Sequence, residues 1–415
     1  MSTLLRQPLM NGVFKKPDNA GRGTRLINVF DLYADTKIDL NLVERLEVSP
    51  SELKRFSVSA GDVFFTRSSL KPEGVAWSSY LEECNQEAVF ECHLIRAKVN
   101  ADLCLPGFVS HYAHTWLARE YLIARAGVTT MATVDQGAIN EMPVVLPSVP
   151  VQFQLLAALD AARATRRAKR AEAEALLAGL DGYLLDTLGL SLPPADDRKV
   201  FAATPKAAQR QGHFNADFFH PERVLAVRAI ENAIELNSFR LDKVVSFVRE
   251  QVKTPEAVYL SLAHVQSNTG ELIDVDEKAA GTCSTFEAND VLFARLRPYL
   301  NKVYRAEMAG SCSPEFHVLR VLDTQVLHPD YLSAILRSSL ILAQTRHMMT
   351  GNTHPRLTGE DVISLVIPVP SPEVQEQIAG EARRRREEAR HLRAEAEAGW
   401  QAAKQAFEER LLGAE

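Results

Sequence analysis

The chain repeats itself at a separation of about 223 residues. The pentapeptide AEAEA stands at 171–175 and again at 394–398, after an arginine-rich run in both places. Ala and Glu are both common in helices, so this match alone could arise by chance. Neighbouring segments match at the same or nearly the same separation: VQFQLLA at 151–157 and VQEQIAG at 374–380, PGFVSHY at 106–112 and PDYLSAI at 329–335, and AGDVFFTR at 60–67 and ANDVLFAR at 288–295. Because a unit of about 200 residues is too long for a solenoid repeat, we interpret the pattern as a duplicated domain.

The first part of each repeat is predicted to be a mixed α/β domain. Short apolar or alternating runs such as DVFFT, VFECHLIRA, VLFARL and EFHVLRV read as strands. Pro106 and Pro329 each precede a segment with helical spacing of apolar residues, and proline suits the first position of a helix. A loop rich in Gly and Thr follows each segment, and then a short predicted strand, VVLP or VIPVP.

The second part of each repeat is predicted to be one long helix. About 35–40 residues without proline give a helix of roughly 50–60 Å, with an apolar stripe too narrow for a core of its own. Such a stripe needs a partner, and the obvious partner is the duplicate helix; the alternative is that each helix packs on its own domain. The predicted division is a first domain at 1–150, a helix at 151–190, a linker at 191–214, a second domain at 215–370 and a second helix at 371–415.

The composition limits the classes of protein to which the chain can belong. Of its 415 residues, 46% are hydrophobic and 24% are charged, as in ordinary soluble domains. No apolar run reaches the roughly 18 residues that span a bilayer, and the first residues lack a signal-peptide core, so we expect a cytoplasmic protein without membrane contact. The five cysteines form no CxxC pair, which argues against a disulfide framework and against a cysteine zinc site.

Two similar domains and two similar long helices indicate a fold with pseudo-twofold symmetry. If the helices pair as an antiparallel coiled coil, they hold the domains one helix length apart. The DNA groove repeats about every 34–36 Å, so two such domains can read two half-sites on one face of a duplex. The net charge of −6 by itself gives no support to this interpretation, because DNA-binding domains are usually basic.

The chain resembles the specificity subunit of Type I restriction–modification systems over nearly its whole length. The resemblance rests on the order of domain, helix, domain, helix, on the GDV and NDV strands followed by TR or AR, on LRPYLNKV at 296–303, and on the arginine-rich AEAEA helix that ends in LLG. It implies an α+β fold with two target recognition domains, each reading half of a bipartite double-stranded DNA site. It also implies that the helices form an antiparallel coiled coil, set the spacing and dock two methyltransferase subunits. Restriction subunits join such a complex, and the specificity subunit has no catalytic activity of its own.

The missing motifs favour a protein that is not an enzyme. There is no GxGxxG after a strand and no GxxxxGK[ST], so no nucleotide cofactor is indicated. The [Asn/Asp]-Pro-Pro-aromatic tetrapeptide of the amino-methyltransferases is absent, and so is HExxH. His111 and His114 are near enough on one helix to share a metal, but no third ligand has a useful spacing. We therefore expect no metal and no cofactor.

Residues suited to DNA contact occur in matching segments of the two domains. They are arginine, lysine, amide and hydroxyl side chains on loops that a sheet would hold. In the first domain they are Lys15, Lys16, Arg67, Ser68, Ser69, Thr129, Thr130 and Thr133, and in the second Arg295, Arg297, Tyr299, Asn301, Lys302, Asn352, Thr353, His354 and Arg356. Arginine can bond guanine in bidentate fashion, asparagine can bond adenine, and threonine or lysine can hold phosphates. Each of them could instead be structural, and Arg297–Tyr299 in particular could be a turn.

Both long helices carry a basic run, RATRRAKR at 163–170 and RRRR at 383–386. These runs could be solvated helix surface, could contact the DNA between the half-sites, or could help to dock methyltransferase subunits. A different function for the whole chain is a coiled-coil scaffold with two protein-binding domains, which the acidic net charge favours weakly. An enzyme ranks third, because no catalytic constellation is visible.

Overall fold

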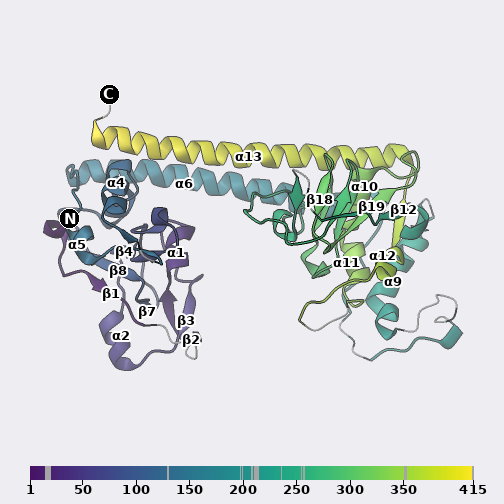
Figure 1. Cartoon of the computed structure of the whole chain (residues 1–415), viewed down its shortest axis with the longest axis horizontal. Coiled ribbons are helices and arrows are strands. Elements are labelled where there is room, and N and C mark those ends of the chain that lie inside the picture. Colours follow the sequence, from purple (N-terminus) through teal and green to yellow (C-terminus); the bar gives the residue numbers. More distant parts are fainter. Residues whose placement is uncertain are drawn as a thin grey trace. The chain divides into compact units, whose positions relative to one another are not determined.

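The computed structural model contains the whole chain, and we describe residues 1–14, 20–128, 130–196, 198, 200–206, 209, 215–234, 236–253, 255, 258–349 and 353–413. The chain divides into two compact units. Unit 1 consists of Met1–Arg167 and Ala396–Glu415, and unit 2 consists of Ala168–Glu395. Each unit contains one mixed α/β domain and parts of both long helices (Figure 1). No helix among the described residues combines the length and the apolar character needed to cross a bilayer.

Short strands and helices make up the domain of unit 1, and its core includes side chains of the last helix. Phe108 and Tyr112 pack in one cluster with Trp400 and Phe407. The elements are η1 (Ser2–Leu4), β1 (Met10–Asn11), β2 (Ala20–Ile27), α1 (Val29–Ala34), β3 (Glu44–Leu46), α2 (Pro50–Phe56), β4 (Asp62–Thr66), β5 (Ser68–Ser69), η3 (Pro72–Gly74), β6 (Ser78–Tyr80), β7 (Ala88–Phe90), β8 (Leu94–Lys98), α3 (Pro106–Tyr112), α4 (Trp116–Ala124), β9 (Gly127–Val128), β10 (Ala132–Thr133) and α5 (Gln136–Glu141).

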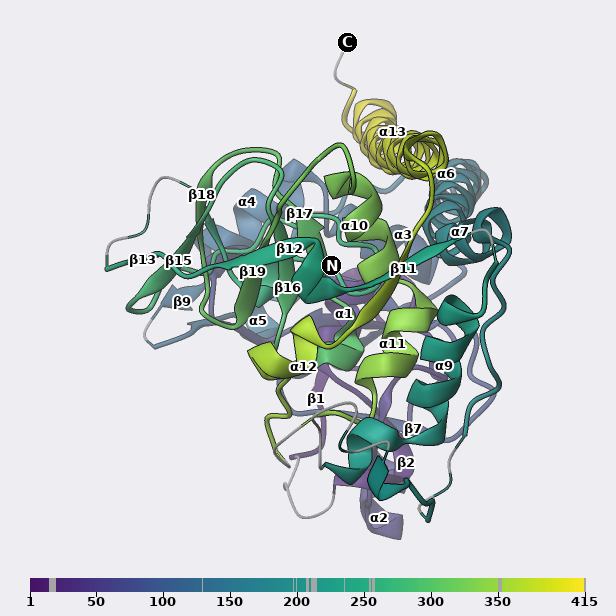
Figure 2. The same ribbon diagram turned by 90° about the vertical axis from the view of Figure 1, so that its right-hand side faces the viewer.

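The domain of unit 2 has the same kind of composition, and its helices α9 and α11 lie side by side in Figure 2. Its elements are η4 (Ala216–Phe219), α9 (Pro221–Glu231), β11 (Asn237–Arg240), η5 (Leu241–Lys243), β12 (Val245–Val248), β13 (Gln251–Val252), β14 (Tyr259–Leu260), η6 (Leu262–His264), β15 (Cys283–Phe286), β16 (Val291–Ala294), η7 (Pro298–Leu300), β17 (Val303–Arg305), β18 (Gly310–Cys312), β19 (Phe316–Val321), α10 (Pro329–Leu336), α11 (Ser339–Thr345), α12 (Gly359–Ile363) and β20 (Val366–Val369).

The same four-stranded antiparallel sheet occurs in both units. Its strand order is β1-β8-β4-β6 in unit 1 and β12-β19-β16-β17 in unit 2. Each unit also has a second sheet that contains one parallel pair, β2 with β7 and β14 with β18. The prediction of two similar mixed α/β domains is therefore confirmed.

The GDV and NDV motifs form equivalent turns at the start of β4 and β16. The residue before each aspartate has a positive φ, 85° for the glycine and 74° for the asparagine. Asp62 and Asp290 are each 2% exposed and accept a hydrogen bond from the backbone N–H three residues earlier. Each also pairs with a cation on the neighbouring strand, Lys98 at 3.0 Å and Arg320 at 2.8 Å. These motifs are explained by folding, because a buried carboxylate needs such partners.

A buried glutamine ties the start of each long helix to its domain. Gln152 accepts a hydrogen bond from the Leu105 N–H at 2.8 Å and donates to the carbonyls of Leu103 and Pro147 at 3.1 and 2.8 Å. Gln375 makes the three equivalent bonds at the repeat-related positions of unit 2. The VQxQ match in the sequence thus marks the junction between domain and helix.

The long helices are α6 (Val149–Ala178) with its continuation α7 (Leu180–Leu188), and α13 (Pro372–Leu412). In unit 1 the beginning of α6 packs against the end of α13, and in unit 2 the end of α6 packs against the first half of α13. The two helices therefore run antiparallel, as predicted. The alternative also holds in part, because Leu184 and Ile378 lie in the domain core of unit 2.

The AEAEA segments lie where the helices touch. Ala173 and Ala396, the central alanines of the two copies, are 0% and 2% exposed. Glu397 pairs with Arg166 of the other helix at 2.8 Å within unit 1. The small alanine allows close packing, and the glutamate stays partly exposed and paired.

Some predicted elements differ from the structure. VIPV forms β20 because it pairs with β11, whereas VVLP at 144–147 is not a strand, since no described strand of unit 1 pairs with it. VFECHLIRA contains two strands, β7 and β8, separated by a turn. The first long helix begins at Val149 and is interrupted at Gly179, where helix α7 takes over.

Candidate nucleic-acid interface

In unit 1 the chain after β4 is joined to the loop before α5. Strand β5 pairs antiparallel with β10, and Ser68 lies opposite Thr133. The Arg67 N–H donates to the His93 carbonyl at 2.7 Å, and the Arg67 carbonyl accepts from the Val134 N–H at 2.9 Å. The backbone of Arg67 is thus fixed on both sides, while its side chain is exposed.

In unit 2 the repeat-related positions make the same connections. Leu296 lies opposite Arg356 in an antiparallel bridge. The Arg295 N–H donates to the Glu315 carbonyl at 2.9 Å, and the Arg295 carbonyl accepts from the Leu357 N–H at 2.9 Å. Two segments that lie about 60 residues apart in the sequence are therefore brought together in the same way in both units.

We call residues 67–69 with 130–134 the strand-end edge of unit 1, and residues 295–299 with 353–357 the strand-end edge of unit 2. The candidate residues that are exposed there are Arg67, Thr130, Thr133, Arg297, Tyr299, Thr353 and His354. Ser69 is partly buried and Ser68 is 8% exposed. The candidates Lys15, Lys16, Thr129 and Asn352 lie outside the described residues.

Two of the candidates point inward and hold unit 2 together. Asn301 is 6% exposed, and its side-chain amide donates to the Arg337 carbonyl at 2.8 Å. The Lys302 ammonium donates to the Leu262 carbonyl at 2.6 Å, and burial lowers the pKa of Lys302. In this conformation both polar groups are used inside the unit, which makes them supports of the edge.

Arg356 is held by a carboxylate. It bonds Glu315 through two nitrogens, at 3.0 and 2.7 Å, and this hydrogen bonding keeps the pKa of Glu315 below its usual value. Arg295 is partly buried and lines a cleft of about 750 Å³ together with Arg249 and His317. The exposed Arg249 was not predicted, although its position directly after strand β12 is a signal that could have found it.

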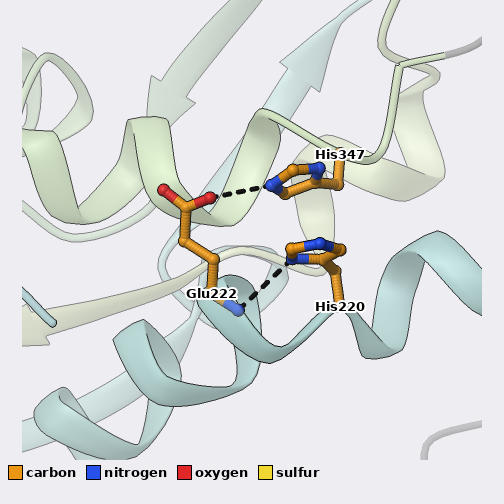
Figure 3. Close-up of side chains that lie close together, drawn as sticks. All are labelled: His220, Glu222 and His347. Carbon is orange, nitrogen blue, oxygen red and sulfur yellow. Dashed lines mark hydrogen bonds and ion pairs between the residues drawn. The ribbon is translucent and has the colours of Figure 1, made fainter. Parts of the chain in front are cut away.

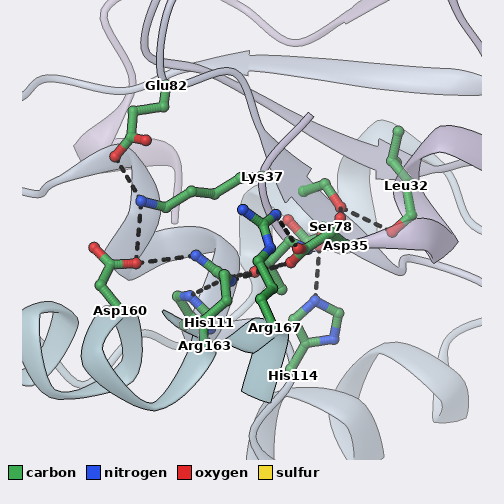
Figure 4. A network of polar contacts seen from close by, with 12 residues as sticks. Leu32, Asp35, Lys37, Ser78, Glu82, His111, His114, Asp160, Arg163 and Arg167 are labelled. Atoms are coloured by element: carbon green, nitrogen blue, oxygen red, sulfur yellow. Dashed lines mark hydrogen bonds and ion pairs between the residues drawn. The ribbon is translucent and has the colours of Figure 1, made fainter. Parts of the chain in front are cut away.

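The basic run of the first helix is anchored on its own unit, as Figure 4 shows. Asp35 pairs with Arg163 at 3.2 Å and with Arg167 at 2.8 Å. Burial by itself would raise the pKa of Asp35, but the two guanidiniums outweigh it and hold this pKa below its ordinary value. His111 contacts Arg163 at 3.3 Å, and His114 lies 2.7 Å from a backbone carbonyl, with a pKa that burial lowers to about 4. His111 is thus buried in unit 1, and His114 is partly buried there.

The basic run of the second helix is anchored in the equivalent way. Glu271 pairs with Arg386 at 3.5 Å and with Arg390 at 2.9 Å, the positions that correspond to the two arginines of unit 1. Arg383 pairs with Asp330 at 2.7 Å, and the remaining two arginines of the run pair with an acidic residue of the same helix. The interpretation of RRRR as solvated surface is therefore wrong for Arg386, whose side chain is 14% exposed. The burial arises because the domain packs over this part of the helix.

No protein-family model matches the chain. Two curated proteins of Escherichia coli are similar in sequence. The Type I restriction enzyme EcoKI specificity subunit of strain K12 is 29% identical over 150 residues, which are 36% of this chain and 32% of that protein. The Type I restriction enzyme EcoDI specificity subunit is 23% identical over 265 residues, 60% of this chain and 55% of that protein. The matches thus span about a third and about half of the relatives' lengths.

A solved structure, described as the structural basis underlying complex assembly and conformational transition of the type I R-M system, matches 99% of this chain and 95% of its own. Its TM-score is 0.52 at 14% identity, so this likeness concerns the fold. A crystal structure of the HsdS subunit from Thermoanaerobacter tengcongensis matches 99% of this chain and 94% of its own at 14% identity, with a TM-score of 0.39. The chain has a duplicated fold of two mixed α/β domains and two long helices. The resemblance to the specificity subunits of Type I restriction enzymes is confirmed.

Proposed function

We propose that the chain is a DNA-specificity subunit of a Type I restriction–modification complex, in which each domain reads one half of a bipartite double-stranded target. The observation that carries the proposal is the strand-end edge, which has the same backbone connections in both units and different exposed side chains. Two edges with the same backbone connections and different exposed side chains are suited to bind two half-sites of different sequence. The resemblance to curated specificity subunits supports the same conclusion.

The exposed side chains of the two edges have the chemistry that base and phosphate contacts need. Arg67 and Arg297 can bond guanine in bidentate fashion, a contact that discriminates by about 1–3 kcal/mol against the wrong base. The threonines can hold phosphates, which fixes the register of the domain on the duplex. Tyr299, 52% exposed, can donate a hydrogen bond to either.

The partners in this proposal are two methyltransferase subunits that dock on the long helices, and restriction subunits that join the complex. The chain itself contributes recognition and no catalysis. Exposed apolar side chains at the start of α6 support docking there, because Phe153 is 67% exposed and Val151 is 38% exposed. Large apolar groups in this setting are typical of protein–protein contacts.

The test is DNase footprinting of the chain in complex with a methyltransferase subunit, on DNA selected for binding. We expect two protected half-sites separated by a spacer of fixed length. Arg67→Ala should weaken selection in one half-site only, and Arg297→Ala in the other only, each by about 1–3 kcal/mol. The matched controls are Arg55→Ala on α2 and Arg228→Ala on α9, which are exposed arginines outside both edges. One continuous site, or equal effects of both edge variants on both halves, would overturn the proposal.

The alternative is a scaffold whose two domains bind proteins. The net charge of −6 favours it. Binding to DNA must weaken steeply as salt rises, because phosphate contacts release counterions. Binding of the two domains to their partners that does not weaken between low and high salt would therefore support the scaffold.

A further inference from the structure

Three side chains of unit 2 form a cluster outside the strand-end edge. His220 caps the N-terminus of α9, Glu222 lies in the first turn of that helix, and His347 follows α11. One potential ligand atom of each lies within 4.8 Å of the others. Figure 3 shows that both imidazole rings present a nitrogen on the side where Glu222 lies. Among the residues that the structure describes, these three form the one group of at least three histidine, cysteine or carboxylate side chains whose ligand atoms lie close enough to hold a metal ion.

The Nδ1 lone pair of His220 is on the inner side of the cluster, where it accepts the hydrogen bond that caps α9, and a metal ion at this nitrogen would replace that bond. Nδ1 of His220 accepts this hydrogen bond from the Glu222 N–H at 3.3 Å, so in the neutral ring the proton is on Nε2. The Nε2 atom lies 3.3 Å from the Arg198 carbonyl, which can accept that proton's hydrogen bond. A histidine that binds a metal usually donates its other ring N–H to such an acceptor, which fixes the tautomer.

The carboxylate of Glu222 is also oriented by a second partner. Glu222 is 4% exposed, and its Oε1 accepts from Arg346 at 2.6 Å while its Oε2 lies 2.7 Å from Nε2 of His347. Carboxylates that bind metals are commonly hydrogen-bonded on the oxygen that does not bind. The Arg346 side chain is 51% exposed, so it can move outward when a cation enters.

The two histidines lie against each other beside Glu222. Besides capping α9, His220 stacks on His347, with ring centroids 3.4 Å apart and planes 15° apart. Two imidazoles and a carboxylate on one side are a ligand set that zinc takes, with water in the fourth position. Ligands about 2.1 Å from a tetrahedral zinc lie roughly 3.4 Å from one another, so ligand atoms up to 4.8 Å apart must approach, and the two stacked rings must turn until their lone pairs aim at one ion.

We propose that unit 2 binds one divalent transition-metal ion of the Zn²⁺ class through His220, Glu222 and His347. The ion fastens the start of α9 to the end of α11. The strand-end edge of unit 2 contributes no ligand to this ion. Metal binding does not depend on whether that edge contacts DNA, so the inference goes beyond the proposed function.

The experiment titrates Zn²⁺ into the full chain, prepared without an affinity tag and stripped with a chelator, by isothermal titration calorimetry. We expect one saturable site and, at a hundredfold excess over Kd, a rise in Tm of roughly 5–10 °C. His220→Gln and His347→Gln should each weaken binding by at least about 100-fold, since even the loss of an indirect partner costs 10–100-fold. The matched control is His391→Gln, a residue that is 66% exposed and pairs with Glu395 at 3.1 Å without a third ligand.

Lack of saturable binding in the unaltered chain would overturn the proposal, and so would an unchanged affinity in the two cluster variants. Because either substitution could also disturb folding, Co²⁺ bound to the unaltered chain is a second readout. A visible absorption band of the strength seen for four-coordinate cobalt supports the site, whereas the weak spectrum of octahedral cobalt overturns it.

Discussion

Replacing Gln152 by alanine tests whether the buried glutamine holds the first domain on its helix. Gln152 is 0% exposed, and its amide satisfies one backbone N–H and two backbone carbonyls. Each such bond contributes about 1 kcal/mol net, and an unpaired buried partner adds a penalty of its own. The expected loss is therefore roughly 3–5 kcal/mol of the free energy of unfolding of unit 1.

The measurement is urea unfolding followed by tryptophan fluorescence. The three tryptophans, Trp77, Trp116 and Trp400, all belong to unit 1, so this signal reports that unit. The amide of Leu105 should also exchange with solvent faster in Gln152→Ala. The control is Gln154→Ala, an exposed glutamine two positions along the same helix, which should change the free energy by less than about 0.5 kcal/mol. A loss below about 1 kcal/mol in Gln152→Ala would refute the reasoning.

Three further substitutions test other contacts. Gly270→Ala should destabilise unit 2 by at least about 2 kcal/mol in a thermal melt, because the φ of Gly270 is +68° and the added Cβ would lie 2.2 Å from the Val303 carbonyl oxygen. The control is Gly281→Ala, which should cost less in the same melt, because a Cβ at this position has open space although its φ is +93°. The lowered pKa of Asp35 reflects a stabilising contribution that is present above about pH 4 and is lost as the pH falls through the folded-state pKa. Asp35→Asn should therefore lower Tm at pH 6, and this difference from the unaltered chain should shrink as the pH falls below 4. Ala173→Leu should cost about 1–3 kcal/mol in urea unfolding of unit 2 followed by circular dichroism, since the larger side chain overfills a helix contact where Ala173 is 0% exposed; an unchanged midpoint would contradict the close packing.

Most of the fold could be predicted because the duplication and the spacing of apolar residues can both be recognised directly in the sequence. DVFFT is a strand with the predicted bounds, and Pro106 and Pro329 are the first residues of their helices. The strand predicted at 144–147 failed for a non-local reason. A strand forms only where a partner lies beside it, and the residues that would supply one are remote in the chain.

The candidate site could be predicted only in part. The strand-end edges follow from matching segments, and Arg67 is exposed there as a contact residue must be. Asn301 is chemically as suitable as Arg67, but its amide is used by a backbone carbonyl 36 positions away. The cluster of His220 and His347 was missed, because no spacing rule joins ligands that far apart in the sequence.

The sequence by itself determined that this chain contains two copies of a mixed α/β domain followed by a long helix. The spacing of apolar residues, the prolines and the turn residues determine local structure through residues that are near in the sequence. Their repetition at a separation of about 223 residues can be recognised from the sequence alone. Only the tertiary structure decided which partners the charged side chains of the long helices have. The two halves of the sequence carry arginines at matching positions, 163 and 167 in the first and 386 and 390 in the second. In the structure each of these two pairs of arginines forms ion pairs with one carboxylate of its own domain. The strength of a charge pair depends on distance and burial, and both are set by packing.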